Sequence, residues 1–173
     1  AQLKQDGFVP LVATMLKRFR IAPSSLELEV TENVLLDRAV DEIAPTLDQL
    51  VKLGVRIALD DFGTGYASLI HLKRFPVHRL KIDQSFVGDI ETSQDSAAIS
   101  RAIIGLAHSL DLRVVAEGVE NERQLAYLRT HGCDFAQGYL FGRPLQGSEL
   151  DDYVAARSVP PCLSSTVLAR LPM

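Results

Sequence analysis

Two adjacent carboxylates, Asp60 and Asp61, are the residues of this 173-residue chain whose arrangement first suggests chemistry. They follow the apolar stretch at 55–59 and precede two glycines that are separated by one threonine. A strand that ends in an acidic turn would give the same pattern, so the pair alone does not decide between structure and function. Three further carboxylates fall at or near the C-terminal ends of other predicted strands: Glu29, Asp83 and Glu117.

These carboxylates should meet around a single lysine, Lys81, because active sites of barrels and open α/β sheets are built at the carboxyl ends of the strands. Burying so much negative charge is costly unless cations compensate it or the groups become protonated. The donors are all oxygens, since no His or Cys lies at a strand end, and this favours Mg²⁺ or Mn²⁺ over Zn²⁺. Asp60 and Asp61 could flank two ions about 4 Å apart, which together with Lys81 suggests phosphoester hydrolysis. The alternative is a set of ordinary surface carboxylates at loop starts.

The elements that must position these residues alternate along the chain. Apolar residues at steps of three and four predict a helix over 8–19, and a capping box at Asn121 and Gln124 predicts a helix through Arg129. Other helices are expected at 43–53, 67–75, 96–110 and 148–156, and strands at 26–30, 55–60, 78–83, 113–117 and 135–141. Connections of this length favour parallel strands covered by helices, which is an α/β layered or barrel fold.

Two of the predicted strands alternate apolar and charged residues. Glu27 and Glu29 share one face of their strand, and Arg79, Lys81 and Asp83 share one face of theirs. Both faces of a parallel sheet are covered, so these charged faces cannot turn to open water. They must point into a barrel interior or a cleft.

Composition excludes several functional classes. The net charge is −4 and there is no basic tract, so we expect no nucleic-acid polymer as partner. No apolar run approaches the roughly 18 residues of a membrane span, and no signal peptide opens the chain. Cys133 and Cys162 form neither a metal spacing nor a disulfide framework, which is typical of a reducing compartment. We therefore expect a cytoplasmic location.

Five segments together resemble one protein family. They are LEVTEN (28–33), ALDDFGTGYASL (58–69), LKIDQSFV (80–87), VVAEGVEN (114–121) and CDFAQGYLFGRPL (133–145). In this order and spacing they resemble the successive blocks of the EAL domain, a family of bacterial phosphodiesterases that hydrolyse cyclic di-GMP to linear pGpG. The resemblance implies a TIM-like (β/α) barrel of eight strands, of which about five are visible here. It divides the chain into domain residues 1–157 and a C-terminal extension or linker at 158–173.

The resemblance also implies roles for individual residues. Asp60 would bridge two Mg²⁺ or Mn²⁺ ions, Lys81 would hold the catalytic water or a phosphate oxygen, and Glu117 would be a ligand or a general base. The implied metal ligands are Glu29, Asp60, Asp61 and Glu117, and the implied catalytic residues are Lys81, Glu117 and Asp61. The implied contacts to the nucleotide are Gln137, Glu120, Arg143 and Pro144.

A loop is implied to couple metal binding to dimerisation. Glu32 would anchor the loop 62–68, which includes Gly63, Thr64 and Gly65, and a homodimer would form through the 62–75 region. Ala67 stands where the family usually has serine, which weakens the loop's hydrogen bonding. The family's signature glutamate strand and asparagine strand have no counterpart, so the chain is expected to be an N-terminally truncated domain with impaired activity.

Three functions remain open at this point. The first is a cyclic di-GMP phosphodiesterase, within a larger membrane-bound or multidomain signalling protein or on its own. The second is a receptor that binds cyclic di-GMP without cleaving it. The third is a dimerising structural module that binds neither metal nor nucleotide.

Overall fold

The computed structural model describes residues 2–5, 7–32, 34, 40–65, 72, 75–147, 149–150, 152–153 and 169–170. Most residues of the helices predicted at 67–75 and 148–156, the substitution at Ala67 and most of the C-terminal extension lie outside these ranges.

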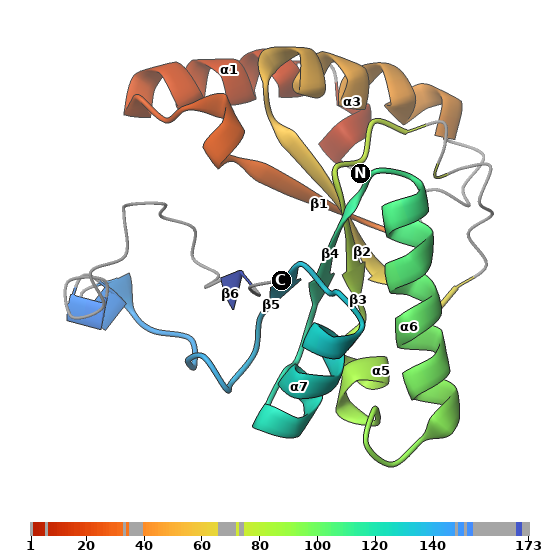
Figure 1. Cartoon of the computed structure of the whole chain (residues 1–173). Coiled ribbons are helices and arrows are strands. Elements are labelled where there is room, and N and C mark those ends of the chain that lie inside the picture. The colour runs from red at the N-terminus through yellow and green to blue at the C-terminus, as the bar shows by residue number, and fades with distance from the viewer. Residues whose placement is uncertain are drawn as a thin grey trace.

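Helices and strands alternate along the described chain (Figure 1). The helical elements are η1 (Gln2–Lys4), α1 (Phe8–Phe19), η2 (Pro23–Ser25), α3 (Val40–Leu53), α5 (Gln84–Gly88), α6 (Gln94–Ser109) and α7 (Glu122–Thr130). The strands are β1 (Glu27–Thr31), β2 (Arg56–Phe62), β3 (Arg79–Ile82), β4 (Arg113–Ala116), β5 (Phe135–Ala136) and β6 (Ala169–Arg170).

The described strands form one sheet in the order β1-β2-β3-β4-β5-β6. The pairs from β1 to β5 are parallel, and β6 pairs with β5 in the antiparallel sense. The connections from β1 to β2, from β3 to β4 and from β4 to β5 each contain a described helix, as crossovers between parallel strands usually do. The predicted α/β fold, with five strands of a (β/α) barrel, is therefore confirmed.

The hydrophobic core lies between the sheet and its helices. Leu59, Leu80 and Val114 occupy one row across β2, β3 and β4, and each is at most 1% exposed. In Figure 1, α1 and α3 lie together over one part of the sheet, and α5, α6 and α7 lie over another. The charged residues of β1 and β3 pair with one another, Arg79 with Glu27 and Lys81 with Glu29, so they share a face as the alternation predicted.

Local signals in the sequence explain several element ends. Asn121 and Gln124 form the predicted capping box at the start of α7, which is thereby confirmed. Ser93 caps α6 by accepting a hydrogen bond from the Ser96 amide. Gly54, with φ 100°, follows the last residue of α3, where a left-handed residue ends a helix.

One expected strand is shorter in the structure, and two elements are additional to those expected. The last parallel strand spans only 135–136 rather than 135–141, because the chain turns at Gly138 (φ 153°) against the Val119 backbone. The short helix α5 was not foreseen; Asp83 caps it by accepting a hydrogen bond from the Ser85 amide at 2.9 Å. Residues 169–170, within the segment expected to be an extension or linker, add β6 to the sheet.

No helix among the described residues is both long and apolar enough to span a membrane.

Candidate active site

A β-bulge explains how two adjacent aspartates can serve one site. Leu59 pairs with Leu80 and Phe62 pairs with Ile82, so Asp60 and Asp61 together oppose a single residue of β3. Successive side chains of a regular strand point to opposite faces. Here Asp61 adopts a left-handed backbone with φ 56°, a conformation that Asp tolerates better than most residues. Both carboxylates consequently lie on the side of the sheet that faces away from the helices.

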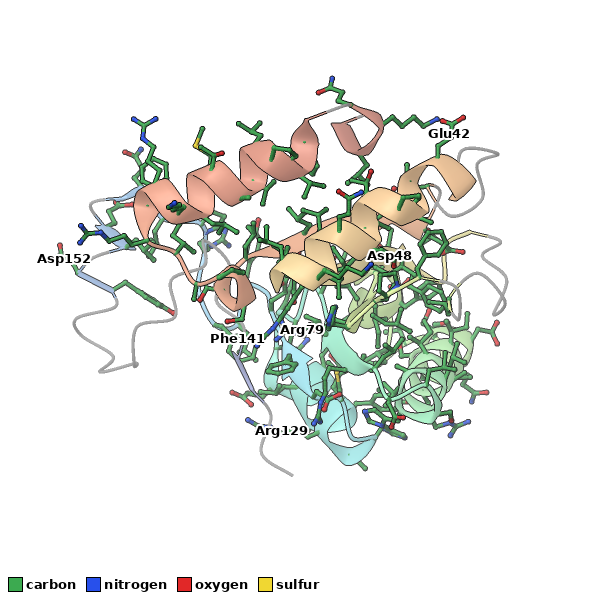
Figure 2. The ribbon with its side chains drawn as sticks, turned by 90° about the horizontal axis from the view of Figure 1, so that it is seen from above. Glu42, Asp48, Arg79, Arg129, Phe141 and Asp152 are labelled. Carbon is green, nitrogen blue, oxygen red and sulfur yellow. The ribbon has the colours of Figure 1, made fainter. Side chains whose placement is uncertain are left out.

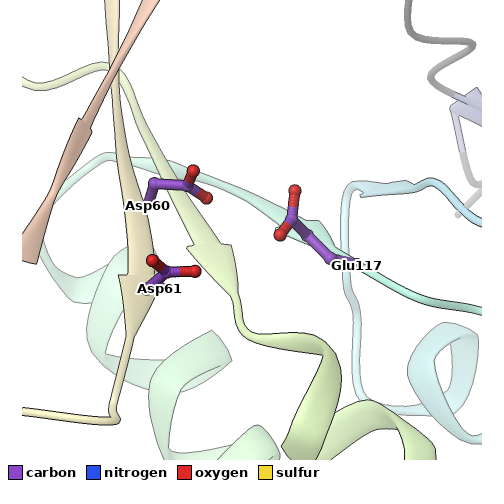
Figure 3. Close-up of side chains that lie close together, drawn as sticks. All are labelled: Asp60, Asp61 and Glu117. Carbon is purple, nitrogen blue, oxygen red and sulfur yellow. The ribbon is translucent and has the colours of Figure 1, made fainter.

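Glu117, which directly follows β4, completes a cluster of three carboxylates. Asp60, Asp61 and Glu117 each offer an oxygen, and these oxygens lie within 4.8 Å of one another. Figure 3 shows the two aspartates of β2 directed toward Glu117 from across the strand ends. The structure therefore brings together three of the four residues expected to bind metal.

Lys81 lies at the centre of the charged groups. Its Nζ is 2.7 Å from Glu29 Oε1, 2.9 Å from Asp60 Oδ1 and 2.6 Å from Glu117 Oε1, and its side chain is only 5% exposed. Glu29, the fourth expected ligand, thus reaches the cluster through Lys81 rather than by direct contact, and 47% of its side chain is exposed.

The pKa shifts of these groups have two causes, which are burial and the charges of their neighbours. Burial alone would lower the pKa of Lys81, but its contacts with Glu117, Glu29 and Asp60 raise it above its ordinary value, so the ammonium stays charged. Burial raises the pKa of Glu117, and the Lys81 charge only partly offsets this. The pKa of Asp61 is raised by loss of solvent and by the carboxylates of Asp60 and Asp83.

An excess of negative charge follows from this arrangement. Four carboxylates and one ammonium leave three uncompensated negative charges when all are ionised. Hard oxygen donors packed this closely are typical ligands of hard divalent cations, whose positive charge would remove the repulsion. The residues present therefore suit a divalent metal.

Gln137 fixes the orientation of Glu117. Its Nε2 donates a hydrogen bond to Glu117 Oε1 at 2.5 Å. The backbone amide of Gln137 donates a hydrogen bond to the Ala116 carbonyl, and the backbone carbonyl of Gln137 accepts one from the Val119 amide. These bonds hold the Gln137 backbone against the segment that contains Glu117. Gln137 was expected inside the last strand but lies just beyond it.

Glu32 holds the start of the loop after β2. This buried carboxylate, 3% exposed, accepts hydrogen bonds from the amides of Gly63 at 3.0 Å and Gly65 at 3.2 Å. A Cβ on Gly65 would lie 3.0 Å from Glu32 Oε1, so a larger residue here would require the Glu32 carboxylate to shift. Thr64, between the two glycines, donates from its hydroxyl to the Asp61 carbonyl at 2.9 Å.

A cavity of about 380 Å³ opens beside Glu117. All four residues expected to contact a nucleotide line it, namely Glu120, Gln137, Arg143 and Pro144. Gln84, Tyr139 and Tyr153, which the sequence had not indicated, also line it. The Arg143 guanidinium lies over the Tyr139 ring, 4.6 Å from its centroid. The spacing of Tyr139 and Arg143 in the GYLFGRP stretch was the signal that could have identified the aromatic residue.

Comparison with known proteins places this geometry in a family. A family model described as the EAL domain matches residues 1–144. The cyclic di-GMP phosphodiesterase NbdA of Pseudomonas aeruginosa is 46% identical over 156 residues, which are 90% of this chain and 20% of that protein. The signaling protein YkoW of Bacillus subtilis is 43% identical over 153 residues, 88% of this chain and 19% of its own length. The chain thus spans about a fifth of these relatives.

Solved structures of EAL domains have folds similar to that of this chain. The EAL domain of Mycobacterium smegmatis DcpA matches with a TM-score of 0.83 at 44% identity, covering 90% of this chain and 70% of that one. The PaMucR phosphodiesterase, in a complex with c-di-GMP, matches with a TM-score of 0.81 at 45% identity, covering 86% of this chain and 60% of that one. With the family model covering most of its length, the chain belongs to the EAL domain family.

Proposed function

We propose that this chain carries the catalytic face of a phosphodiesterase that hydrolyses cyclic di-GMP to linear pGpG. The observation that carries the proposal is the carboxylate cluster around Lys81, set directly beside a cavity of about 380 Å³. That volume is within the usual range for small-molecule sites. The name of the NbdA relative and the c-di-GMP complex of PaMucR support the choice of substrate.

Asp60, Asp61, Glu117 and Glu29 would hold two Mg²⁺ or Mn²⁺ ions. When bound, such ions supply Lewis-acid stabilisation of the negative charge that develops during phosphodiester hydrolysis. The three closely spaced carboxylates would contribute most of the binding, and Asp60, which contacts Lys81 and precedes Asp61, would be one of these ligands.

Lys81 would act as a permanent hydrogen-bond donor rather than as a base. Its pKa is raised, so it carries a proton at neutral pH and can orient the attacking water or a phosphate oxygen. Glu117 would serve as a metal ligand or as the general base, with Gln137 holding one of its oxygens. A raised pKa makes Glu117 a better proton acceptor than an ordinary carboxylate.

The cavity would bind the nucleotide. The stacked side chains of Tyr139 and Arg143 offer planar surfaces for a guanine base, and the guanidinium can pair with a phosphate. Glu120 and Pro144 would complete this wall.

We also propose a metal-linked homodimer through the 62–75 region. Glu32, next to the end of β1, binds the amides of Gly63 and Gly65, two and four residues after Asp61, so a change at the aspartates would be transmitted to the loop. Light scattering with and without Mn²⁺ tests this assembly.

A cyclic di-GMP receptor is the second candidate. It is favoured by Glu29, which is 47% exposed and stands outside the mutual contacts of the other three carboxylates. If this side of the site holds its ion weakly, nucleotide binding would persist while cleavage would not.

The deciding experiment measures pGpG release by chromatography, with Mn²⁺ and with Mg²⁺, and nucleotide binding by calorimetry. Both are applied to this chain and to the full-length product of its gene. Lys81→Ala is expected to abolish release, while Lys52→Ala, which changes an exposed lysine of α3, should leave it intact. Nucleotide binding without any release in both proteins would refute catalysis and establish the receptor.

A further inference from the structure

A second charged layer lies beneath the carboxylate cluster. Arg79 Nη1 lies 2.9 Å from Glu27 Oε1 and 2.8 Å from Glu27 Oε2. The two side chains are only 14% and 20% exposed. The Arg79 guanidinium also lies over the Phe135 ring of β5, 4.7 Å from its centroid. Figure 2 places Arg79 near the middle of the molecule, whereas Glu42, Arg129 and Asp152 lie at its margins.

This layer has the construction of a barrel interior. Its three members come from β1, β3 and β5, and layers inside (β/α) barrels are formed by side chains from alternate strands. The carboxylate cluster around Lys81 forms the upper layer. Glu29 and Lys81 each lie two residues further along β1 and β3 than Glu27 and Arg79 do, so both layers pair a glutamate of β1 with a basic residue of β3. Two bridges therefore join the same pair of strands, one above the other.

The lower bridge must cross β2 to join strands that are not neighbours. In the strand register Ala58 lies between Glu29 and Arg79, on the same face, and it is completely buried. A methyl group leaves room for the guanidinium to pass toward Glu27. A larger residue at this position would occupy the path of the bridge.

We propose that Arg79 is a positioning residue for the phosphodiester hydrolysis proposed above. By binding Glu27 across Ala58 and stacking on Phe135, it fixes the separation of β1 and β3, and this sets Glu29 against Lys81. The role is indirect, because Arg79 touches neither the cavity nor the carboxylate cluster. Displacement of reacting groups by about 1 Å can cost a hundredfold in rate, and loss of groups that orient metal ligands typically costs about 10- to 100-fold in metal affinity.

The test compares Arg79→Met with Arg113→Met. Arg113 begins β4, pairs with Asp134 at 2.6 Å and is 64% exposed, so its loss removes an ion-paired arginine from the sheet away from the site. We expect Arg79→Met to lower kcat about 10- to 100-fold with KM for cyclic di-GMP within about twofold. Calorimetry should show Mn²⁺ affinity reduced about tenfold. Arg113→Met should leave all three quantities unchanged.

Two further variants cover the case in which Arg79→Met does not fold. Arg79→Lys keeps the charge but lacks the planar group that stacks on Phe135, so we expect kcat between wild type and Arg79→Met. Ala58→Val obstructs the bridge without altering either partner, and we expect it to lower kcat and Mn²⁺ affinity in the same direction. Wild-type kcat and Mn²⁺ affinity in Arg79→Met, or in both of these variants, would overturn the proposal.

Failure of the proposed function is distinguishable from failure of this inference. If wild type releases no pGpG, the phosphodiesterase assignment falls, but the Mn²⁺ affinities of wild type, Arg79→Met and Arg113→Met still report whether the lower layer positions the carboxylates.

Discussion

Replacing Lys81 with Met should destabilise the protein strongly in the presence of a chelator and much less in the presence of Mn²⁺. Lys81 contacts Glu29, Asp60 and Glu117, whose side chains are 47%, 20% and 16% exposed. Removing one partner of a fully buried ion pair costs about 3–5 kcal/mol. Because these carboxylates keep part of their solvent, we expect a loss of about 2–4 kcal/mol, which corresponds to a fall in Tm of about 4–16 °C for a chain of this size.

Mn²⁺ should reverse much of this loss. Without the ammonium the cluster is more negative, so the ion binds it more tightly, and saturation at a hundred times Kd adds about 2.7 kcal/mol. The assay is thermal unfolding followed by circular dichroism, with chelator and with Mn²⁺, on wild type, Lys81→Met and Lys52→Met. A Tm for Lys81→Met in chelator that matches Lys52→Met would refute the reasoning, since it would mean that water, not Lys81, stabilises the carboxylates.

Three other perturbations test separate parts of the structure. Asp134 accepts hydrogen bonds from the Val114 amide, His108 and Arg113. Burial would raise the pKa of Asp134, but these hydrogen bonds outweigh burial and hold the pKa below its ordinary value. Asp134→Asn should therefore lower the free energy of unfolding by about 1–3 kcal/mol at pH 7. Because the pKa of Asp134 is depressed in the folded state, the stability difference between wild type and Asp134→Asn should be constant above about pH 5 and vanish as the pH falls through the folded pKa. An acid titration followed by fluorescence or circular dichroism measures this difference. Gly138→Ala should prevent folding or lower the free energy of unfolding, measured in urea, by more than about 4 kcal/mol. The added Cβ would lie 2.3 Å from the Val119 backbone nitrogen at a φ of 153°. A variant as stable as wild type would contradict this turn geometry. Glu32→Gln removes the charge that accepts hydrogen bonds from the Gly63 and Gly65 amides. We expect a loss of about 1–2 kcal/mol in the free energy of unfolding and faster proteolysis at the loop that contains these glycines. An unchanged rate of proteolysis would argue against the anchoring of this loop by Glu32.

Regular periodicity made much of the fold predictable. Helix α1 and the first four strands follow from apolar spacing, and the charged faces of β1 and β3 were correctly assigned to the interior because a parallel sheet offers them no open water. The early end of β5 could not be foreseen. It depends on Gly138 meeting Val119, a contact between residues that are far apart in the sequence.

The site was predictable in composition but not in geometry. Spacing placed Asp60 and Asp61 at a strand end, yet strand periodicity alone would send their side chains to opposite faces. The bulge that unites them is defined by the register with β3 and by a left-handed backbone at Asp61, and neither is visible from one strand. The spacing of Tyr139 and Arg143 is visible in the sequence, but the contact between their side chains, which makes Tyr139 part of the cavity wall, is visible only in the structure.

Charge balance is what separates the two interior layers, although both begin from the same pattern. Glu27 and Arg79 precede Glu29 and Lys81 by two residues in β1 and β3, so strand geometry alone does not distinguish the two bridges. The lower layer contains one acid and one base, and Phe135 covers the guanidinium, so the layer is neutral and needs no ligand. The upper layer gains additional acids from the bulge of β2 and from the end of β4, and one lysine cannot balance them. The same alternation therefore produces a structural bridge where charges match and a cation-binding centre where they do not. For that reason Arg79→Met should weaken Mn²⁺ binding without abolishing it, whereas removing Asp61 or Glu117 should abolish it.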